Sequence, residues 1–481
     1  MTVSPATFTV ENPATLEIID RVADTTPEDA RAAVDRASDA FGPWSTASPR
    51  ERAEVLRRTY ELMIRDRDEL ARLISVENGK SLADAAAEVV YAAEFFRWFS
   101  EEAVRSGGDY GEAPAGGART IVRHRPVGVA ALVTPWNFPA AMPARKIAPA
   151  LGAGCTAVLK PAEETPLTAF ALAALMREAG LPVGALEVVA TRDAPGVVTA
   201  WLTDRRVRKI SFTGSTGVGR QLLHQAADRV VNASMELGGN APFIVTEDAD
   251  IEAAVAGAMI AKFRNAGQAC TAANRFYVHA DVAEQFVSRL GAEIERLEVG
   301  NAADGAVIGP LISAAAVRRV GKAVDDAVRD GARITHRSAL PDAPGYFFPP
   351  TLLADVHPDA AILGEEIFGP VAPVVAWRDE AEMLSWADDT EYGLASYVFA
   401  GDVGRALRIG EHLEAGMVGI NRGLVSDPSA PFGGIKQSGL GREGAREGIR
   451  AFQETQYLSV DWPQHLVQGE SRSFTAARRR R

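Results

Sequence analysis

Cys270 and Glu236 are the two residues of this chain whose types and surroundings best suit chemistry on a carbonyl carbon. Cys270 ends the segment Asn-Ala-Gly-Gln-Ala-Cys and is one of two cysteines in 481 residues, and Glu236 lies upstream in Met-Glu-Leu-Gly-Gly-Asn. A cysteine thiolate attacks electrophilic carbon, and a nearby carboxylate can afterwards take a proton from water. Two cysteines cannot build a disulfide framework, so we expect chemistry at one sulfur.

The bulk composition indicates a soluble protein of two or three domains. Hydrophobic residues make up 47% and charged residues 24% of the chain, which is ordinary for globular proteins. The net charge of −12 gives no general attraction to nucleic acid or anionic lipid. The exception is the run Arg478–Arg481, which we interpret as a solvated tail; nucleic-acid binding through it is a weaker alternative. We expect no nucleic-acid or membrane partner.

The predicted location is the cytoplasm. The first ten residues lack the basic start and apolar core of a secretory signal, and no apolar stretch reaches the roughly 20 residues that span a bilayer. Two cysteines without an evident pairing fit a reducing compartment.

The elements that must position Cys270 and Glu236 form a repeating pattern of strands and helices. The first hundred residues read as helices over 27–41, 48–78 and 82–105, and 119–134 turns strand-like. Strands and helices then alternate: strands 156–159, 186–190 and 207–212, and helices 166–179 and 214–227. This alternation of strands and helices predicts a parallel sheet covered by helices, an architecture that often binds nucleotides. A second α/β run covers roughly 240–440, with strands 372–377 and 395–399, and 455–461 reads as a late strand that serves another subunit.

Three segments that follow predicted strands could bind ligands. Gly214-Ser-Thr-Gly-Val-Gly219 opens a helix, so its amides could hold a phosphate, although it departs from G-x-G-x-x-G and a plain strand–helix turn explains it equally well. Asn137 in Thr134–Pro139 could donate to a developing oxyanion, or it could be a structural turn residue. Lys160 and Glu163 could hold ribose hydroxyls, or they could belong to a solvated loop.

Two arginines lie close in sequence to these candidates. Arg145 follows Asn137 on the next stretch of chain, and Arg264 precedes Cys270. If Asn137 and Cys270 meet in one site, both guanidinium groups could enter it, and paired guanidinium groups suit a carboxylate. Taken singly, each arginine could equally be a surface residue.

Together these segments resemble the aldehyde dehydrogenase superfamily over nearly the whole chain. The matching stretches occur in family order and spacing: Thr134-Pro-Trp-Asn-Phe-Pro139, Lys160-Pro-Ala-Glu-Glu-Thr-Pro166, Phe212-Thr-Gly-Ser-Thr216, Met235-Glu-Leu-Gly-Gly-Asn240, Gly267-Gln-Ala-Cys270, Glu365-Glu-Ile-Phe-Gly-Pro370 and Pro431-Phe-Gly-Gly434. The resemblance implies an α/β fold with a Rossmann-type cofactor domain, an α/β catalytic domain and a small β oligomerisation arm.

The resemblance also implies domain boundaries and assembly. The NAD-binding domain would comprise 1–107 and 126–237, and the catalytic domain 238–440. The arm would comprise 108–125 and 441–465, followed by a tail over 466–481. Strands near 108–125 and 453–462 would bridge the subunits of a homodimer or homotetramer.

The implied reaction is NAD(P)-dependent oxidation of an aldehyde through a thioester on Cys270. Asn137 and the Cys270 backbone N–H would hold the oxyanion, hydride would pass to the nicotinamide, and Glu236 would activate the water that releases the acid. Lys146 and Glu443 match family positions proposed to carry the proton away from that glutamate. No metal site is implied.

The implied cofactor site has two ribose contacts and a phosphate contact. Lys160 and Glu163 would hold the adenine ribose, Glu366 and Phe368 the nicotinamide ribose, and Ser215 would lie near the pyrophosphate. A carboxylate at Glu163 would accept from a 2′-hydroxyl and repel a 2′-phosphate, so we predict NAD over NADP. The other expected cofactor positions are Thr134, Pro135, Trp136, Gly214, Leu237 and Gly238.

Within the superfamily the chain most resembles NAD(P)-dependent succinate-semialdehyde dehydrogenases. The resemblance rests on Ala141-Met-Pro-Ala-Arg-Lys146, Phe263–Cys270 and Gly423-Leu-Val-Ser426. It implies that the substrate is bound by Arg145, Arg264, Ser426, Phe138 and Phe432. A short semialdehyde with an anionic tail would compensate two buried cations, whereas an apolar aldehyde would not.

Three departures from the family pattern bear on these expectations. The family's first strand before Asn12-Pro-Ala14 is expected to be largely missing. Ala272 replaces a second cysteine found in some relatives, so no disulfide switch is expected. Arg422 and Asp427-Pro428 differ from the commonest pattern and leave the substrate's chain length open. Glutarate semialdehyde, a pathway-specific aldehyde and a non-catalytic family member are the remaining alternatives.

Overall fold

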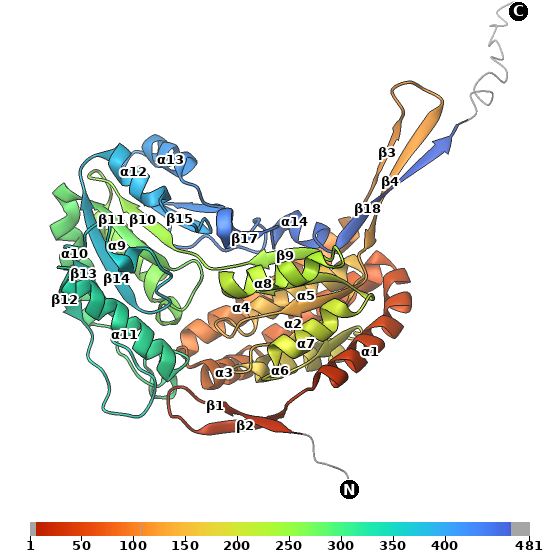
Figure 1. The fold of residues 1–481 in the computed structure, drawn as a ribbon, viewed down its shortest axis with the longest axis horizontal. Helices are drawn as coiled ribbons and strands as arrows, with labels where there is room; N and C mark the ends of the chain where they lie inside the picture. Colours follow the sequence, from red (N-terminus) through yellow and green to blue (C-terminus); the bar gives the residue numbers. More distant parts are fainter. Residues whose placement is uncertain (1–5, 106, 463–481) are drawn as a thin grey trace, which may run out of the picture.

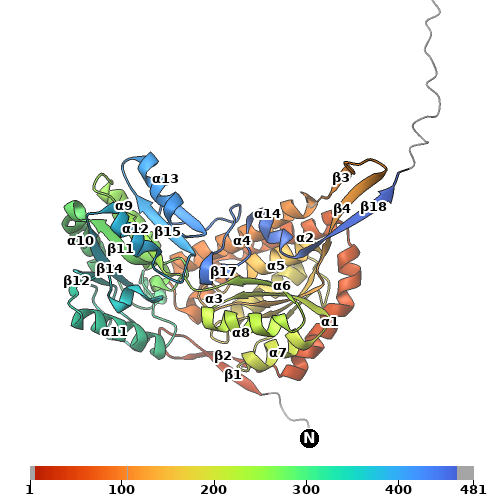
Figure 2. The same cartoon turned by 45° about the horizontal axis from the view of Figure 1, so that its top comes forward.

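Two α/β bodies face each other, and a β arm projects from one of them (Figure 1). The computed structural model describes residues 6–105 and 107–462. Turning the molecule shows the same division and the same projecting arm (Figure 2). The predicted α/β class is confirmed.

The first body is built on a six-stranded sheet in the order β17-β9-β8-β5-β6-β7. Its strands are parallel except for β17, which pairs antiparallel with β9. The strands are β5 (Val129–Val133), β6 (Thr156–Lys160), β7 (Leu186–Val188), β8 (Val207–Thr213), β9 (Asn232–Glu236) and β17 (Gly439–Leu440).

The two faces of this sheet bury separate cores, because successive side chains of a strand point to opposite sides. Ala130 and Leu132 of β5 pack with α2, α4, α5 and α6. Val129 and Ala131 of the same strand face α1, α7 and α8. The helices are α1 (Pro27–Thr46), α2 (Pro49–Arg65), α3 (Arg67–Asn78), α4 (Leu82–Arg105), α5 (Ala141–Ala153), α6 (Pro166–Glu178), α7 (Ala194–Thr203) and α8 (Thr216–Ala227).

Helix starts in the first body follow capping signals in the sequence. Thr26 and Asp29 form a capping box at α1, and Ser48 and Glu51 form another at α2. The segment predicted as one helix over 48–78 is two helices, because the backbone of Asp66 (φ −98°, ψ 19°) leaves helical geometry. The predicted helix at 82–105 is confirmed as α4.

The second body contains a seven-stranded sheet in the order β12-β13-β14-β11-β10-β15-β16. Only β12 runs antiparallel to its neighbour. The strands are β10 (Ala241–Val245), β11 (Ala273–His279), β12 (Arg333–Arg337), β13 (Thr351–Ala354), β14 (Val371–Trp377), β15 (Ala395–Phe399) and β16 (Met417–Ile420). The accompanying helices are α9 (Ile251–Phe263), α10 (Ala280–Glu295), α11 (Ala314–Arg329), α12 (Glu380–Asp388) and α13 (Val403–His412), with short 3-10 turns at Arg264–Gly267, Ala302–Asp304, Ala361–Leu363 and Lys436–Ser438.

The arm is a three-stranded antiparallel sheet in the order β18-β4-β3. Its strands are β3 (Asp109–Glu112), β4 (Ala118–Pro126) and β18 (Gln453–Asp461). Figure 1 shows the arm extending away from both bodies. Tyr110 and Tyr457 on it are exposed. The helix before it, α14 (Ala445–Arg450), lies outside the arm, because Ile449 and Phe452 are buried in the core of the first body.

The N-terminal strand expected to be missing is present, so that expectation is wrong. β1 (Thr7–Glu11) pairs antiparallel with β2 (Ile18–Ala23). The alternating pattern Thr-Phe-Thr-Val buries Phe8 and Val10 against the first body. The hairpin also reaches the second body, where the Tyr346 amide donates to the Pro13 carbonyl at 3.0 Å.

None of the helices in 6–105 and 107–462 is long and apolar enough to cross a membrane. The predicted Arg478–Arg481 run and the 466–481 tail lie outside the described residues.

Candidate active site

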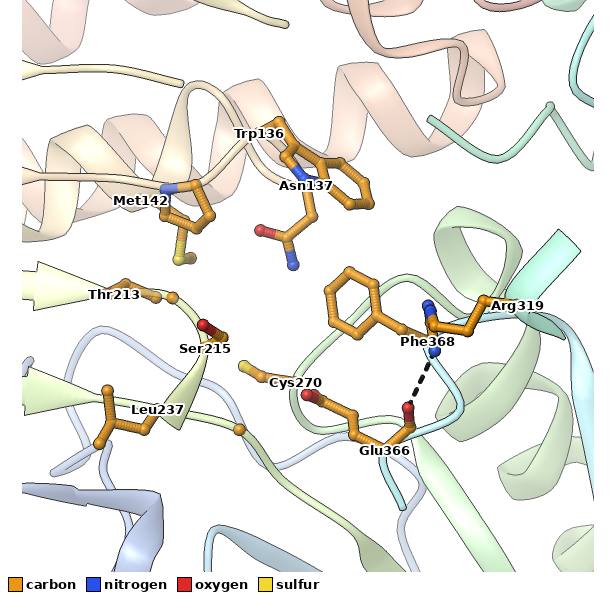
Figure 3. A pocket seen from close by; sticks show the side chains of 13 residues that line it. Trp136, Asn137, Met142, Thr213, Ser215, Leu237, Cys270, Arg319, Glu366 and Phe368 are labelled. Carbon is orange, nitrogen blue, oxygen red and sulfur yellow. Dashed lines mark hydrogen bonds between the residues drawn. The ribbon is translucent and has the colours of Figure 1, made fainter. Parts of the chain in front are cut away.

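A cavity of about 280 Å³ holds many of the predicted residues (Figure 3). The thiol of Cys270, the amide of Asn137 and the Glu366 and Phe368 side chains point toward its centre in Figure 3. The lining residues are Pro135, Trp136, Asn137, Met142, Thr213, Gly214, Ser215, Leu237, Gly238, Cys270, Arg319, Glu366 and Phe368. Segments from both bodies therefore meet here, and Asn137 and Cys270 line one cavity.

An unusual backbone turn presents Cys270. Asn265, Ala266 and Gly267 have φ of 50°, 53° and 73°, so three consecutive residues adopt left-handed conformations that non-glycine residues rarely take. The Gln268 side chain fixes this turn by donating to the carbonyl of Pro310 at 3.3 Å and accepting from the amide of Ile312 at 2.9 Å. The turn places the half-buried Cys270 at the cavity wall.

The thiol form of Cys270 is favoured in this state. Burial and the carboxylate of Glu366 raise the pKa of Cys270 to about 12, and Arg145 and Arg264 oppose that rise. A nucleophilic thiolate therefore requires either a proton acceptor or added positive charge in the cavity. Ala272 occupies the position of a second cysteine, and Cys155 is buried elsewhere in the first body, so the two cysteines are free thiols.

Asn137 is held directly against the Cys270 turn. Its Nδ2 donates to the Gln268 carbonyl at 3.1 Å, and its own carbonyl accepts from Asn265 Nδ2 at 2.8 Å. The amide carries two N–H groups, so one hydrogen remains for an oxyanion formed at Cys270.

A buried ion pair that the sequence analysis did not single out holds the loop around Asn137. Lys80 pairs with Glu88 in the interior, and Lys80 Nζ also donates to the Asn137 carbonyl at 2.8 Å. Glu88 Oε1 accepts from the amides of Ala140 and Ala141 at 2.8 and 3.2 Å. These bonds orient Asn137 through its backbone.

Glu236 ends β9 behind the cavity wall rather than on it. Both carboxylate oxygens are buried and have no hydrogen-bond partner among the described residues. Burial, and then the nearby Glu443, raise the pKa of Glu236 well above its usual value, which makes it a stronger base. Gly433 leaves space for the Glu236 carboxylate, because the Cβ of any other residue at position 433 would lie 2.8 Å from Glu236 Oε1.

Lys146, Glu443 and Arg145 form one buried charged group beside Glu236. Lys146 donates to Glu443 Oε1, and Arg145 Nε lies 3.3 Å from Glu443 Oε2. Glu443 alone does not balance the two cations, and Glu236 beside them is the second carboxylate that acts on Arg145.

Tyr91 joins Arg145 to Ser426. Arg145 Nη2 donates to the Tyr91 hydroxyl at 2.9 Å and lies 3.5 Å from Ser426 Oγ, and the two hydroxyls are hydrogen-bonded to each other. The guanidinium also lies 3.9 Å from the centre of the Phe432 ring. The predicted residues Arg145, Ser426 and Phe432 are therefore in contact, although they do not line the cavity of Figure 3.

Arg264 has no ion-pair partner among the described residues. It is half-buried, its guanidinium lies 5.3 Å from the centre of the Phe138 ring, and it forms no hydrogen bond or ion pair with any residue in 6–105 or 107–462. A partly desolvated guanidinium in this setting favours an anionic ligand.

Eight of the eleven predicted cofactor residues line the cavity, and the other three, Thr134, Lys160 and Glu163, do not. Ser215 precedes α8 without capping it, which leaves the N-terminal amides free for a phosphate. Lys160 and Glu163 lie 3.3 Å apart at the end of β6, and Thr134 donates its amide to the Lys160 carbonyl. Burial raises the pKa of Glu366 to about 7.

The cavity also includes three residues that the sequence analysis did not select: Met142, Thr213 and Arg319. Arg319 donates to the carbonyls of Glu366 and Ile367 at 3.2 and 2.8 Å, and so fixes the backbone before Phe368. Figure 3 shows the bond to Glu366. Thr213 follows Phe212 in a recognised motif and could have been selected, whereas Arg319 has no sequence signal because it lies in an ordinary amphipathic helix.

The model of the Aldehyde dehydrogenase family matches residues 2–458. The chain belongs to this family. A succinate-semialdehyde dehydrogenase of Paenarthrobacter nicotinovorans is 51% identical over 92% of this chain and 98% of its own length. A glutarate-semialdehyde dehydrogenase of Pseudomonas putida is 49% identical over 94% of each chain. The crystal structure of an E. coli NADP-dependent enzyme matches with a TM-score of 0.93 and 46% identity over 95% of each chain.

Family membership confirms the predictions of fold and of an oxidoreductase that oxidises an aldehyde. The family uses NAD or NADP as the hydride acceptor. The roles of individual residues remain predictions, and the geometry above bears on each of them.

Proposed function

We propose that this aldehyde dehydrogenase oxidises succinate semialdehyde to succinate. The observation that carries the proposal is Arg264, a half-buried guanidinium that lacks a counter-charge among the described residues. The buried guanidinium of Arg145 supports it, as do relatives named for carboxylate-bearing semialdehydes. Ser426 and Tyr91 supply hydroxyl donors beside Arg145 for the carboxylate of the substrate.

Replacing Arg264 with alanine is expected to lower kcat/KM for succinate semialdehyde by about 10- to 100-fold, the usual effect of a lost charge-assisted contact. The same change should alter kcat/KM for butanal, an uncharged aldehyde of equal length, by less than about threefold. Steady-state NADH formation with both substrates measures the difference. Arg72→Ala, an exposed arginine on α3, is the control. Equal losses on the two aldehydes would contradict the carboxylate contact.

Glutarate semialdehyde is the second candidate substrate. It carries the same carboxylate one methylene farther from the aldehyde, and the P. putida relative is named for it. A panel of semialdehydes of increasing length separates the two, because a rigid clamp at Arg145 and Arg264 favours one length in kcat/KM.

In the proposed mechanism the Cys270 thiol gives its proton to water in the cavity, and the resulting thiolate attacks the aldehyde carbon. Asn137 Nδ2 and the Cys270 amide stabilise the oxyanion. A bound nicotinamide dinucleotide supplies the hydride acceptor. Glu236 then takes a proton from water, which attacks the thioester on Cys270 and releases the acid. Lys146 and Glu443, already bonded to each other, receive the proton from Glu236.

We propose NAD as the preferred dinucleotide. Its adenine ribose would lie against Lys160 and Glu163, its pyrophosphate at Gly214 and Ser215, and its nicotinamide ribose against Glu366 and Phe368. The remaining wall of that site would be Thr134, Pro135, Trp136, Leu237 and Gly238. Glu163 is partly exposed at the end of β6, where a carboxylate suits a 2′-hydroxyl and repels a 2′-phosphate.

Glu163→Ser is expected to raise kcat/KM for NADP relative to NAD by about tenfold, because it removes a negative charge from the site of the 2′-phosphate. Initial rates with each dinucleotide at saturating aldehyde give the ratio. Glu164→Ser, at the adjacent position, controls for general loss of charge. An unchanged ratio, or a wild-type enzyme that prefers NADP, would refute this assignment.

The proposed domain division has 1–107 and 126–237 as cofactor domain and 238–440 as catalytic domain, although β17 at the end of the latter range pairs with the sheet of the first body. The proposed oligomer forms through the arm, whose exposed Tyr110 and Tyr457 suit a partner surface. A cytoplasmic homodimer or homotetramer agrees with two free cysteines.

A further inference from the structure

One face of the β8–β9 strand pair carries a run of polar side chains from the active site to the surface. Because the strands are parallel and in register, these side chains face one another in pairs: Lys209 with Asn232, Ser211 with Ser234, and Thr213 with Glu236. We call these six residues the polar ladder. The intervening Ile210 and Phe212 point into the opposite, apolar core.

The polar ladder is buried except at one end. Lys209 is fully buried, Ser211 and Ser234 are nearly so, and Asn232 is exposed. Burying an ammonium and two hydroxyls on a sheet face costs free energy that apolar residues would avoid. The distance from Asn232 to Glu236 along β9 is roughly 13 Å at the usual rise of a strand.

Hydrogen bonds join three residues of the polar ladder to one another and a fourth, Ser211, to Lys146. Lys209 Nζ donates to Asn232 Oδ1 and to Ser234 Oγ, both at 2.7 Å. At the inner end Lys146 Nζ donates to Ser211 Oγ at 3.0 Å and also to Glu443. The proposed proton acceptors at the active site are thus bonded to the ladder.

Two steps of the route lack a hydrogen bond. Glu236 has no hydrogen-bond partner among the described residues, so its proton reaches Glu443 by a side-chain rotation or through a water molecule. The other step joins Ser211 to Ser234. They are direct neighbours across parallel strands, which lie about 4.8 Å apart, so one hydroxyl rotation or one water molecule spans the gap. The charged or titratable groups that act on Lys209 are Lys146 from α5, Cys155 and Glu443.

Lys209 is suited to exchange protons near neutral pH. Burial, and then the charge of Lys146, lower the pKa of Lys209 to about 7. An amine with such a pKa is populated in both protonation states, which an ordinary surface lysine is not.

We propose that the polar ladder conducts the proton of the attacking water from Glu236 to solvent at Asn232. The water O–H bond breaks and its proton passes to Glu236, then to the Glu443–Lys146 pair. Lys146 gives a proton to Ser211 as Ser211 gives one to Ser234, Ser234 gives one to Lys209, and Lys209 releases one to solvent beside Asn232. One proton enters and one leaves. The inference rests on the proposed role of Glu236.

Lys209→Met tests the route, because methionine keeps the length and volume of the side chain and removes the amine. We expect the first-turnover burst of NADH to keep its rate and steady-state kcat to fall by at least about tenfold. The solvent isotope effect, kcat in H2O divided by kcat in D2O, should increase. Added imidazole should restore part of kcat, because it can accept the proton that Lys209 no longer carries. Unchanged kcat, an equal loss in burst and steady state, or no response to imidazole would overturn the proposal.

Lys262→Met is the matched control. Lys262 is also fully buried, donates to an asparagine oxygen (Asn274 Oδ1, 2.9 Å) and has its pKa lowered to about 7, but it lies on α9 of the second body. Its replacement should leave the solvent isotope effect unchanged and give no imidazole rescue. Identical behaviour of the two methionine variants would assign Lys209 a purely structural role.

Ser234 provides a second test that does not disturb Lys209. Ser234→Ala should reproduce the slow, imidazole-sensitive turnover, and Ser234→Thr, which keeps the hydroxyl, should not. Loss in both variants would refute conduction through that hydroxyl. Glu236→Gln separates the role of Glu236 from the role of the polar ladder. If this variant turns over normally, Glu236 is not the base. If it stops turnover while the Lys209 and Ser234 variants do not, Glu236 keeps its role and only the proposed proton route is refuted.

Discussion

Cys270→Ala is expected to lower kcat for aldehyde oxidation by about 10⁴-fold or more, the scale of losing a covalent nucleophile. The burst of NADH in the first turnover should disappear as well, because no thioester can form. Dinucleotide binding, followed by protein fluorescence, should be retained, since the thiol contributes only one part of the cavity wall. Stopped-flow NADH formation with succinate semialdehyde measures the loss.

The chain's second cysteine supplies the control for this experiment. Cys155 is buried, its thiol donates to the Phe452 carbonyl at 3.3 Å, and burial raises its pKa to about 11. Cys155→Ala should keep the burst. Oxidation that survives in Cys270→Ala, or a burst that is lost only in Cys155→Ala, would remove Cys270 from the role of nucleophile.

Glu236→Gln is expected to separate the two halves of the reaction. Glutamine preserves the shape of the side chain but cannot accept the proton of water, so one NADH per site should form at the wild-type rate. Steady-state turnover should then be about 10²- to 10⁴-fold slower. The raised pKa of Glu236 and the absence of hydrogen-bond partners for its oxygens among the described residues are the reasons for this expectation.

Mass spectrometry of the trapped enzyme should find the acyl group on Cys270 in the Glu236→Gln variant. Glu102→Gln, a buried carboxylate on α4 that pairs with Arg105 at 3.0 Å, is the comparison and should accumulate no acyl-enzyme. Normal turnover in Glu236→Gln, or a missing burst, would show that Glu236 is not the base for thioester hydrolysis.

Short-range signals made much of the fold predictable. Proline and acidic residues marked the start of α1, and apolar runs marked β8 and β15. The break at Asp66 was missed because both flanking segments have strong helical patterns. The N-terminal strand was missed because it is short and is stabilised by distant partners, such as Ala190 in the hydrophobic cluster around Phe8.

The site was predictable where a motif carries the chemistry and unpredictable where tertiary contacts do. Cys270 and Asn137 were found from their motifs and line one cavity. Tyr91 and Lys80 were not selected, because a tyrosine and a lysine in helical surroundings carry no signal until the fold brings them to Arg145 and Asn137. Nor could the sequence show that Arg145 shares Glu443 with Lys146, since that pairing depends on side-chain placement.

The return of α14 to the first body has a consequence for biosynthesis. Ile449 and Phe452 complete a core whose other members include Leu56 and Phe99, so that core is not complete until nearly the whole chain has left the ribosome. Domains usually fold in order of synthesis, N-terminal first, but here the core of the N-terminal body receives its last members from the end of the chain. A prematurely terminated chain would therefore expose an unfinished apolar surface and be a target for chaperones, rather than yield a folded half-enzyme.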